Sequence, residues 1–258
     1  MEMSYENLVI TIDNYVATVK INHPPVNSVN LATIHDIEKA FDELEASKDV
    51  RVIILTGEGE KSFSAGFDVS DAGNAASAGE EGQRVWTKIF RLTKPVIAAI
   101  NGFAFGGGCE LAMACHFRLM SDAPKAKIGL TELNLGIIPG WGGTQRMTVL
   151  LGRSKALDMI LFSKRLTAQE ACEIGLVDKV CPADKLMDEA RAMAEKLINR
   201  PPLGVASVLK AIATGIDWNF DKGLQTELEG TKLVSTSADA IEGFTAFMQK
   251  REPQFKGE

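Results

Sequence analysis

The fold is decided by residues 94–116, whose sequence is KPVIAAINGFAFGGGCELAMACH. The apolar run Val96–Ile100 is typical of a strand buried on both faces, and Asn101-Gly102 indicates a turn after it. Gly106–Gly108 then opens an apolar helix that carries one charge, Glu110. Because a carboxylate among apolar side chains is costly unless it is paired, hydrogen-bonded or protonated, Glu110 is a candidate for acid–base chemistry.

This stretch also has other interpretations. Glycines at a helix start leave N–H groups free to face a developing negative charge, but they also allow close packing. A glutamate in the first turn can simply complement the helix dipole. The stretch alone therefore supports a functional site and mere packing about equally. The glycines and Glu110 argue against a membrane span, so no membrane association is predicted.

The composition is that of a soluble globular protein with a sizeable core, with 258 residues, 45% apolar and 24% charged. The net charge of −6 argues against a nucleic-acid partner, which would favour a basic face. The N-terminal residues MEMSYE are acidic and lack an apolar signal region, which predicts a cytoplasmic location. The four cysteines lack metal-binding spacing, so no metal is predicted.

Outward from the central stretch, strands and helices alternate up to about residue 180, and the last third of the chain is helical. Before the stretch, the patterns predict a hairpin at 7–21 turning at Asp13-Asn14, a helix at 31–46, a strand at 51–56, a mobile loop at 72–83 and a helix at 84–92. After it, they predict short strands at 117–121 and 126–129, a turn or short helix at 131–136, and helices at about 143–151, 154–162, 167–173, 183–199, 202–214, 217–235 and 237–250. The chain is therefore expected to be an α/β body with a helical appendage.

The glycine clusters do not fit nucleotide-binding loops. The clusters at 106–108 and 140–143 both lack the third glycine of a dinucleotide fingerprint. Neither of them continues into Gly-Lys-Ser or Gly-Lys-Thr, as a P-loop would. The glycines therefore need another purpose.

Three segments that follow predicted strands combine into a candidate site. Residues 63–68 (FSAGFD) and 106–110 (GGGCE) can each present backbone N–H groups at a sheet edge. Glu132, after a third strand, offers a second carboxylate, although it could equally be a solvated turn residue. Two amide donors and two carboxylates suit chemistry next to a carbonyl, because the donors stabilise an enolate oxygen and the carboxylates move protons.

The sequence resembles the enoyl-CoA hydratase (crotonase) superfamily over nearly its full length. The segments that carry the resemblance are PVNSVN at 25–30, FSAGFD at 63–68, KPVIAAING at 94–102, GGGCEL at 106–111, IPGWGGTQR at 138–146, TAQEA at 167–171 and GLVD at 175–178. The resemblance implies an α/β fold of the crotonase type, with a spiral of ββα units at 1–195 that carries the active site. It further implies a C-terminal helical trimerisation region at 196–258, an acyl-CoA thioester substrate, and a homotrimer or a dimer of trimers.

The resemblance also implies roles for site residues. It places the two oxyanion-hole N–H groups on Phe67 and Gly107, and the catalytic pair on Glu110 and Glu132. By this analogy Glu110 acts as the base on the attacking water, and Glu132 delivers a proton to the α-carbon. Gly140 offers a backbone contact to the water.

The substrate contacts come from the same resemblance. Backbone carbonyls near Ala65 and Val69 are expected at the adenine of CoA, and no cofactor is implied beyond the CoA of the substrate. The remaining CoA-binding candidates are Val26, Ser28, Gly66, Asp68, Phe247 and Lys250, the last of which could equally lie on a solvated helix face. The sequence departs from the family pattern after Asp68, where the lysine that many members use for the CoA phosphates is absent. Trp86 and Trp141 are acyl-pocket candidates, and Trp141 could either narrow the pocket or merely pack.

The presence of both glutamates favours a hydro-lyase that adds water to a 2-enoyl-CoA to give a 3-hydroxyacyl-CoA. An enoyl-CoA isomerase and a hydratase for cyclic or dienoyl thioesters are the alternatives within the superfamily. A non-catalytic module that binds RNA or a protein is a further alternative. The acidic charge and the intact carboxylate pair argue against it.

Overall fold

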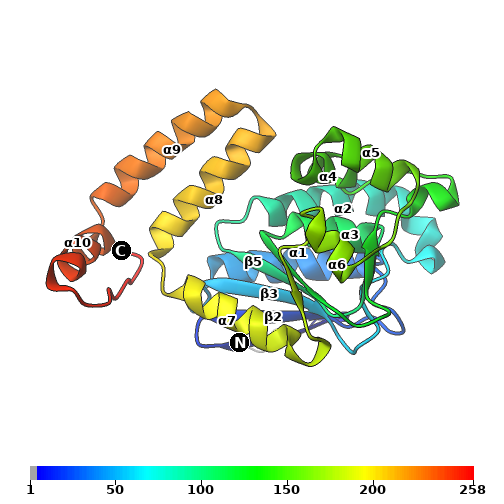
Figure 1. Ribbon diagram of the computed structural model, residues 1–258, viewed down its shortest axis with the longest axis horizontal. Coiled ribbons are helices and arrows are strands. Elements are labelled where there is room, and N and C mark those ends of the chain that lie inside the picture. The colour runs from blue at the N-terminus through cyan, green and yellow to red at the C-terminus, as the bar shows by residue number, and fades with distance from the viewer. Residues whose placement is uncertain (1–4) are drawn as a thin grey trace.

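The computed structural model describes residues 5–258, in which two sheets are surrounded by helices (Figure 1). The first four residues, which include most of the acidic N-terminal segment and the start of the predicted core, lie outside the described residues. The larger sheet has the strand order β1 (Leu8–Asp13), β2 (Val16–Ile21), β3 (Val52–Gly57), β5 (Val96–Ile100), β7 (Phe117–Ser121), β10 (Lys179–Cys181). The smaller sheet has the order β4 (Ser62–Ser64), β6 (Phe103–Phe105), β8 (Lys127–Gly129), β9 (Leu166–Thr167).

From β3 to β8, consecutive strands alternate between the two sheets. In the pairs β3–β4, β5–β6 and β7–β8, the first strand joins the large sheet and the second joins the small one. Strands β3, β5 and β7 are parallel to one another, as are β4, β6 and β8. Helices α1 (Leu31–Ala46), α2 (Ala75–Phe90) and α3 (Gly107–Ala114) each precede one of these pairs. This repetition is the predicted spiral of ββα units.

The central strands β3 and β5 of the large sheet are buried on both faces. Along β3, Ile53 and Leu55 enter the core cluster shared with α1, α2 and α3, whereas Val52 and Ile54 enter a second cluster. That second cluster is closed by α7 (Leu186–Ile198), which crosses the opposite face of the sheet (Figure 1). Because successive side chains of a strand point to opposite faces, burial on both sides requires the continuous apolar runs seen in the sequence.

The helical segments other than α1–α3 and α7 are η1 (Val69–Asn74), η2 (Glu132–Leu135), α4 (Gly143–Leu151), α5 (Arg153–Leu161), α6 (Ala168–Glu173), η3 (Ala183–Lys185), α8 (Pro202–Asp217), α9 (Phe220–Ser235) and α10 (Ala238–Gln249). The C-terminal third of the chain is helical, as predicted. Helices α8 and α9 form a hairpin that projects away from the sheets, and α10 follows it (Figure 1). The predicted boundary between residues 195 and 196 falls inside α7, whose Ile198 is still part of the core. The division into a core and an oligomerisation region stays a prediction.

The prediction of a mobile loop at 72–83 is wrong. Residues 75–90 form one helix, α2, because Ala78, Val85, Trp86 and Ile89 place an apolar stripe against the core. The glycines at 79 and 82 lower the intrinsic helix propensity of this segment, and burial of the stripe outweighs that cost. The short strands β4, β6, β9 and β10 have no clear periodicity and were not predicted.

The predicted hairpin at 7–21 is confirmed by the antiparallel pairing of β1 with β2. Its turn is formed by Asn14 and Tyr15, both in the left-handed region, and so lies one residue later than the predicted Asp13-Asn14. The capping box of Thr167 and Glu170 is also present at the start of α6. We find no helix in residues 5–258 with the length and hydropathy that a bilayer span requires.

Candidate active site

The candidate site lies where the parallel strands of the small sheet end. Residues 65–68 follow β4, residues 106–107 follow β6 and residues 130–132 follow β8, so all three segments meet at one sheet edge. Gly66 allows the first two segments to touch, because a Cβ there would lie 2.7 Å from the Phe105 carbonyl oxygen and 2.9 Å from the Gly107 nitrogen. Its φ of +86° also favours glycine.

Two backbone N–H groups at this junction have no protein acceptor among residues 5–258. Val29 donates to the Gly66 carbonyl and accepts from Asp68 N–H, so the intervening Phe67 N–H points away from Val29. Gly107 is the first residue of α3, and an N–H in the first helical turn has no intrahelical acceptor. Phe67 and Gly107 line the same cavity.

The first carboxylate, Glu110, is held by the loop that precedes α4. Its Oε1 accepts hydrogen bonds from Trp141 N–H at 2.8 Å and Gly143 N–H at 2.7 Å, and the residue is 2% exposed. Glycine at 143 lets the carboxylate approach the backbone, because a Cβ there would lie 2.8 Å from the same oxygen. Burial, with the neighbouring charge of Glu132 second, raises the pKa of Glu110 to about 7 despite the two hydrogen bonds.

The second carboxylate, Glu132, is buried at the start of η2 and is not a solvated turn residue. Its Oε2 has no hydrogen-bond partner among the described residues. Its Oε1 lies against Gly106, 3.0 Å from the position that a Cβ would occupy there. Burial raises the pKa of Glu132 above its ordinary value. Both carboxylates line the cavity that Phe67 and Gly107 also line.

A buried cation, Arg146, lies behind the Glu110 loop and was not singled out from the sequence. Its Nη2 donates to the Trp141 carbonyl, and its charge acts to lower the pKa of Glu110. The same guanidinium approaches Gly142, where a Cβ would lie 2.4 Å from Nη2. In the sequence, the buried position of Arg146 is signalled only by a charged residue on the face of α4 that packs inward.

The cavity at this junction has a volume of about 320 Å³. Its apolar walls come from α2, through Ala75 and Gly79, and from residues 135–141. Trp141 and Gly140 line it, whereas Trp86 lies one layer behind. Trp86 is fully buried, and its Nε1 donates to the Gly107 carbonyl at 3.0 Å.

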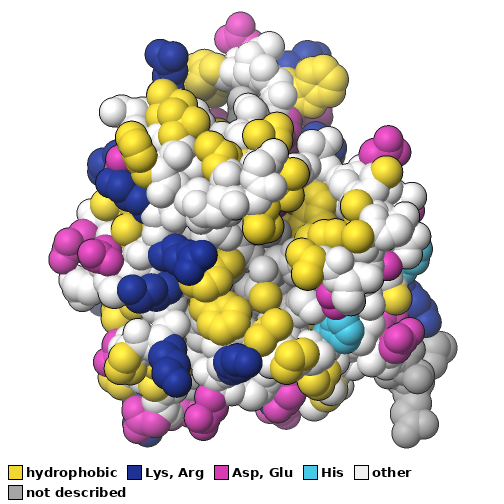
Figure 2. Space-filling model, turned by 90° about the vertical axis from the view of Figure 1, so that its right-hand side faces the viewer, with side chains coloured by type: hydrophobic (Ala, Val, Ile, Leu, Met, Phe, Trp, Pro, Cys, Tyr) yellow, Lys and Arg dark blue, Asp and Glu magenta, His cyan; other side chains and the backbone are white. Residues whose placement is uncertain are grey.

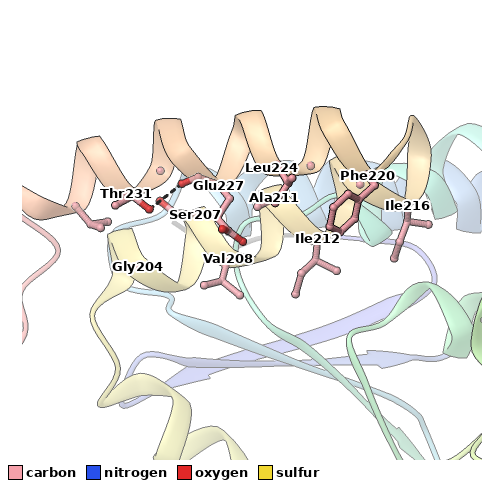
Figure 3. A pocket seen from close by; sticks show the side chains of 14 residues that line it. Gly204, Ser207, Val208, Ala211, Ile212, Ile216, Phe220, Leu224, Glu227 and Thr231 are labelled. Atoms are coloured by element: carbon pink, nitrogen blue, oxygen red, sulfur yellow. Dashed lines mark hydrogen bonds between the residues drawn. The ribbon is translucent and has the colours of Figure 1, made fainter.

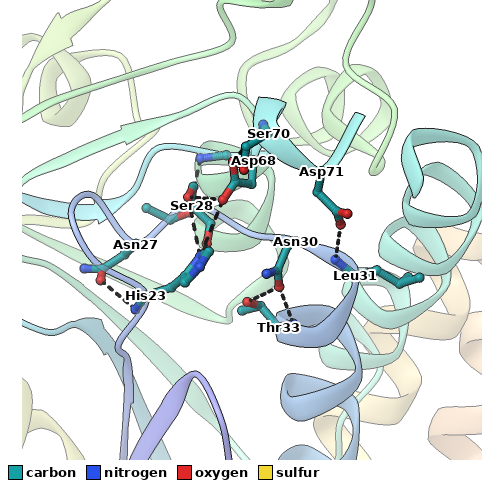
Figure 4. Close-up of polar contacts among 11 residues, drawn as sticks. His23, Asn27, Ser28, Asn30, Leu31, Thr33, Asp68, Ser70 and Asp71 are labelled. Carbon is teal, nitrogen blue, oxygen red and sulfur yellow. Dashed lines mark hydrogen bonds and ion pairs between the residues drawn. The ribbon is translucent and has the colours of Figure 1, made fainter. Parts of the chain in front are cut away.

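Several of the CoA-binding candidates lie beside the cavity. Ala65 and Val69 line it, and Ala65 N–H donates to the Val26 carbonyl at 3.1 Å. Ser28 Oγ donates to Asp68 Oδ2 at 2.9 Å, with His23 beside them (Figure 4). Hydrogen bonds from Ser70, above all from its hydroxyl, hold the pKa of Asp68 below its ordinary value.

Two candidates are not brought to the site within one chain. Phe247 and Lys250 belong to the end of α10, which lies at the opposite end of the molecule from α4 (Figure 1). Phe247 is 84% exposed. In residues 5–258, no group of three or more His, Cys, Asp or Glu side chains is placed to hold a metal ion.

The fold and site define a class of protein, an α/β protein with two buried carboxylates and two free amides at one apolar cavity. The model of the enoyl-CoA hydratase/isomerase family matches residues 11–258. A probable enoyl-CoA hydratase of Bacillus subtilis is 39% identical, covering 96% of this chain and 98% of the relative. A crotonyl-CoA hydratase of Syntrophomonas wolfei is 38% identical, covering 98% and 99%. The crystal structure of enoyl-CoA hydratase from Bacillus anthracis superimposes with a TM-score of 0.93 at 37% identity, covering 98% of this chain and all of that one (100%).

The chain belongs to the enoyl-CoA hydratase/isomerase family. The predicted family, its fold, and the prediction of an enoyl-CoA hydratase-like enzyme are confirmed by these matches.

The raised pKa of Glu110 predicts how stability depends on pH. Its pKa is about 7 in the folded protein against an ordinary value of 4.5, so folding strengthens proton binding. The stabilisation by protonated Glu110 is complete below about pH 4.5 and is lost as the pH rises through about 7. We expect Glu110→Gln to gain on the order of 3 kcal/mol of unfolding free energy relative to wild type across this range. Urea unfolding of both proteins at a series of pH values measures the difference in their unfolding free energies. A difference that does not change with pH would contradict the raised pKa of Glu110.

Proposed function

We propose that the protein adds water across the double bond of a 2-enoyl-CoA to give a 3-hydroxyacyl-CoA. One observation carries this proposal. Glu110 and Glu132 line the same cavity as the unpaired N–H groups of Phe67 and Gly107. An isomerase needs to move only protons, whereas a hydratase must also hold a water, and two buried carboxylates beside one cavity suit that task.

The Phe67 and Gly107 N–H groups would serve as the oxyanion hole. Addition of water to an α,β-unsaturated thioester moves negative charge onto the thioester oxygen. Two amide donors aimed at that oxygen stabilise the enolate, and each such donor is typically worth about 3–4 kcal/mol. Trp86 supports this arrangement, because its hydrogen bond to the Gly107 carbonyl fixes the start of α3.

The two carboxylates would divide the acid and base roles. Glu110 takes a proton from the water as its oxygen bonds to the β-carbon, and Glu132 gives a proton to the α-carbon. Two neighbouring buried carboxylates titrate as a pair, so one can stay protonated near neutral pH while the other is ionised. Burial raises the pKa of both groups, which supports a proton held by the pair near neutral pH. The assignment of base to Glu110 and acid to Glu132 follows the family resemblance. The backbone of Gly140 would contact the water.

The CoA part of the substrate would lie over residues 26–28 and 65–69. Ala65 and Val69 line the cavity there, the hydrogen bonds of Ala65 to Val26 and of Val29 to Gly66 hold the two segments together, and Ser28 holds Asp68 in place. The absent lysine after residue 68 leaves the CoA phosphates without that partner, and we expect solvent or another basic residue to meet them.

We infer that the protein forms a homotrimer or a dimer of trimers. Apolar side chains of α8 and α9 line a cavity of about 590 Å³ between the two helices, with Phe220 77% exposed (Figure 3). Hydrophobic side chains also gather across the middle of the face on the α5 side (Figure 2), and Phe162 after α5 is 73% exposed. Burial of such surfaces favours association. In an oligomer, Phe247 and Lys250 would reach the CoA of a neighbouring subunit.

Turnover of crotonyl-CoA in isotopically labelled water tests the proposed function. A hydratase lowers the enoyl-thioester absorbance and places one solvent oxygen in the product. An isomerase shifts a 3-enoyl double bond without incorporating oxygen, and a cyclic or dienoyl hydratase leaves crotonyl-CoA untouched but hydrates its own substrate. Absence of turnover with every enoyl-CoA, together with retention of RNA at physiological salt, would favour a binding module.

A further inference from the structure

The indole of Trp141 is wedged among four neighbours. Its ring meets Trp86 at a centroid distance of 5.1 Å and Phe67 at 6.3 Å, both in edge-on geometry. Two glycines complete the enclosure, because a Cβ would lie 2.5 Å from the indole at Gly82 and 2.2 Å from it at Gly107. The ring therefore fills its niche, with no room for it to move further into the core.

The backbone of Trp141 fixes the ring from the other side. Its N–H donates to Glu110, and its carbonyl accepts from Arg146. Only 5% of the residue is exposed, and it lines the cavity that holds both carboxylates. The indole is therefore a rigid inner wall of that cavity and not a side chain free to swing aside.

The wall facing Trp141 is made of small residues of α2. Ala75, Gly79 and Gly82 recur at helical spacing and lie on one face of the helix. Gly82 lies against the indole, whereas a Cβ at Gly79 would meet nothing within 4 Å. The open part of the cavity therefore lies beside Gly79, one helical turn from Gly82, and the indole forms its end.

We propose that Trp141 limits the substrate to short 2-enoyl groups by closing the inner end of the acyl pocket. This inference rests on the proposed function. A cavity of about 320 Å³ must hold the thioester end, the water and the acyl chain. That volume is at the lower limit of small-molecule sites, and the indole occupies the space into which a longer chain would extend.

The test compares kcat/KM for crotonyl-, hexenoyl-, octenoyl- and decenoyl-CoA in wild type and Trp141→Ala. We expect the octenoyl-to-crotonyl ratio of kcat/KM to rise by about ten-fold or more in the variant, because each methylene in an apolar pocket is worth about 10–200-fold. A ratio within about two-fold of wild type in a folded variant would overturn the inference.

Two further variants keep the test decisive if Trp141→Ala does not fold. Trp141→Phe removes only part of the ring and should shift the ratio in the same direction by a smaller factor. Gly79→Leu fills the cavity from α2 and should shift it in the opposite direction. Tyr15→Ala is the matched control, because Tyr15 lies in the β1–β2 turn, is 45% exposed and does not line this cavity, so the ratio should not change.

Calorimetric binding of saturated butyryl- and octanoyl-CoA separates this inference from the proposed function. If no enoyl-CoA is turned over but octanoyl-CoA gains affinity in Trp141→Ala, the pocket inference stands and the proposed function fails. If turnover occurs and neither the kinetic nor the binding preference moves, the pocket inference fails alone.

Discussion

Glu110→Gln and Glu132→Gln should each lower kcat for hydration of crotonyl-CoA by about 10²–10⁴-fold, the range typical of a lost general acid or base. In the Glu110→Gln variant, the side-chain amide oxygen can still accept from Trp141 and Gly143 N–H, so the loop should keep its place. The loss should therefore appear in kcat and only weakly in affinity for butyryl-CoA. Loss of enoyl-thioester absorbance measures the rate.

Glu60→Gln is the matched control for these variants. Glu60 is an exposed residue in the turn between β3 and β4, away from the cavity lining, and its variant should hydrate crotonyl-CoA at the wild-type rate. Full activity in either Glu110→Gln or Glu132→Gln would remove the assigned acid and base roles.

Gly66→Ala should lower kcat by about 10²–10³-fold, the effect expected when one oxyanion donor is displaced. The new Cβ would collide with the Phe105 carbonyl and the Gly107 nitrogen, so the segments that carry the two free amides must separate. Initial-rate assays on crotonyl-CoA, with the melting temperature measured in parallel, report the effects on catalysis and on stability separately.

The matched control for Gly66→Ala is Gly59→Ala. Gly59 has a similar φ of +79°, but a Cβ there meets nothing within 4 Å. It therefore carries the backbone strain of alanine at positive φ without the collision. Equal losses of kcat in the two variants would mean that strain alone acts, and the close approach of the two segments would have no catalytic role.

Much of this architecture follows from local sequence. The buried strand β5, the turn after it and the lone charge at Glu110 are all readable from residues 94–116, because a strand buried on both faces must be apolar throughout. The first half of α2 was predicted to be a loop, because its two glycines are compatible with a loop until the burial of Trp86 is known. Local propensity is a weak guide where tertiary packing decides.

The site shows the same limit. Nothing near Glu132 in the sequence indicates burial, since Gly106, which packs against it, comes from a distant segment. Arg146 lies inside a segment that carries the family resemblance, yet its role depends on a contact with the Trp141 carbonyl across the turn before α4. Contacts of this kind depend on the three-dimensional path of the chain, which spacing alone does not fix.

The position of residue 141 separates two properties that evolution can vary independently. Its peptide N–H donates to Glu110, the proposed base, whereas its side chain lines the cavity in which we propose that it limits the acyl chain. Any residue except proline supplies the N–H, so side-chain exchange here can diversify the substrates of a lineage while its reaction is retained.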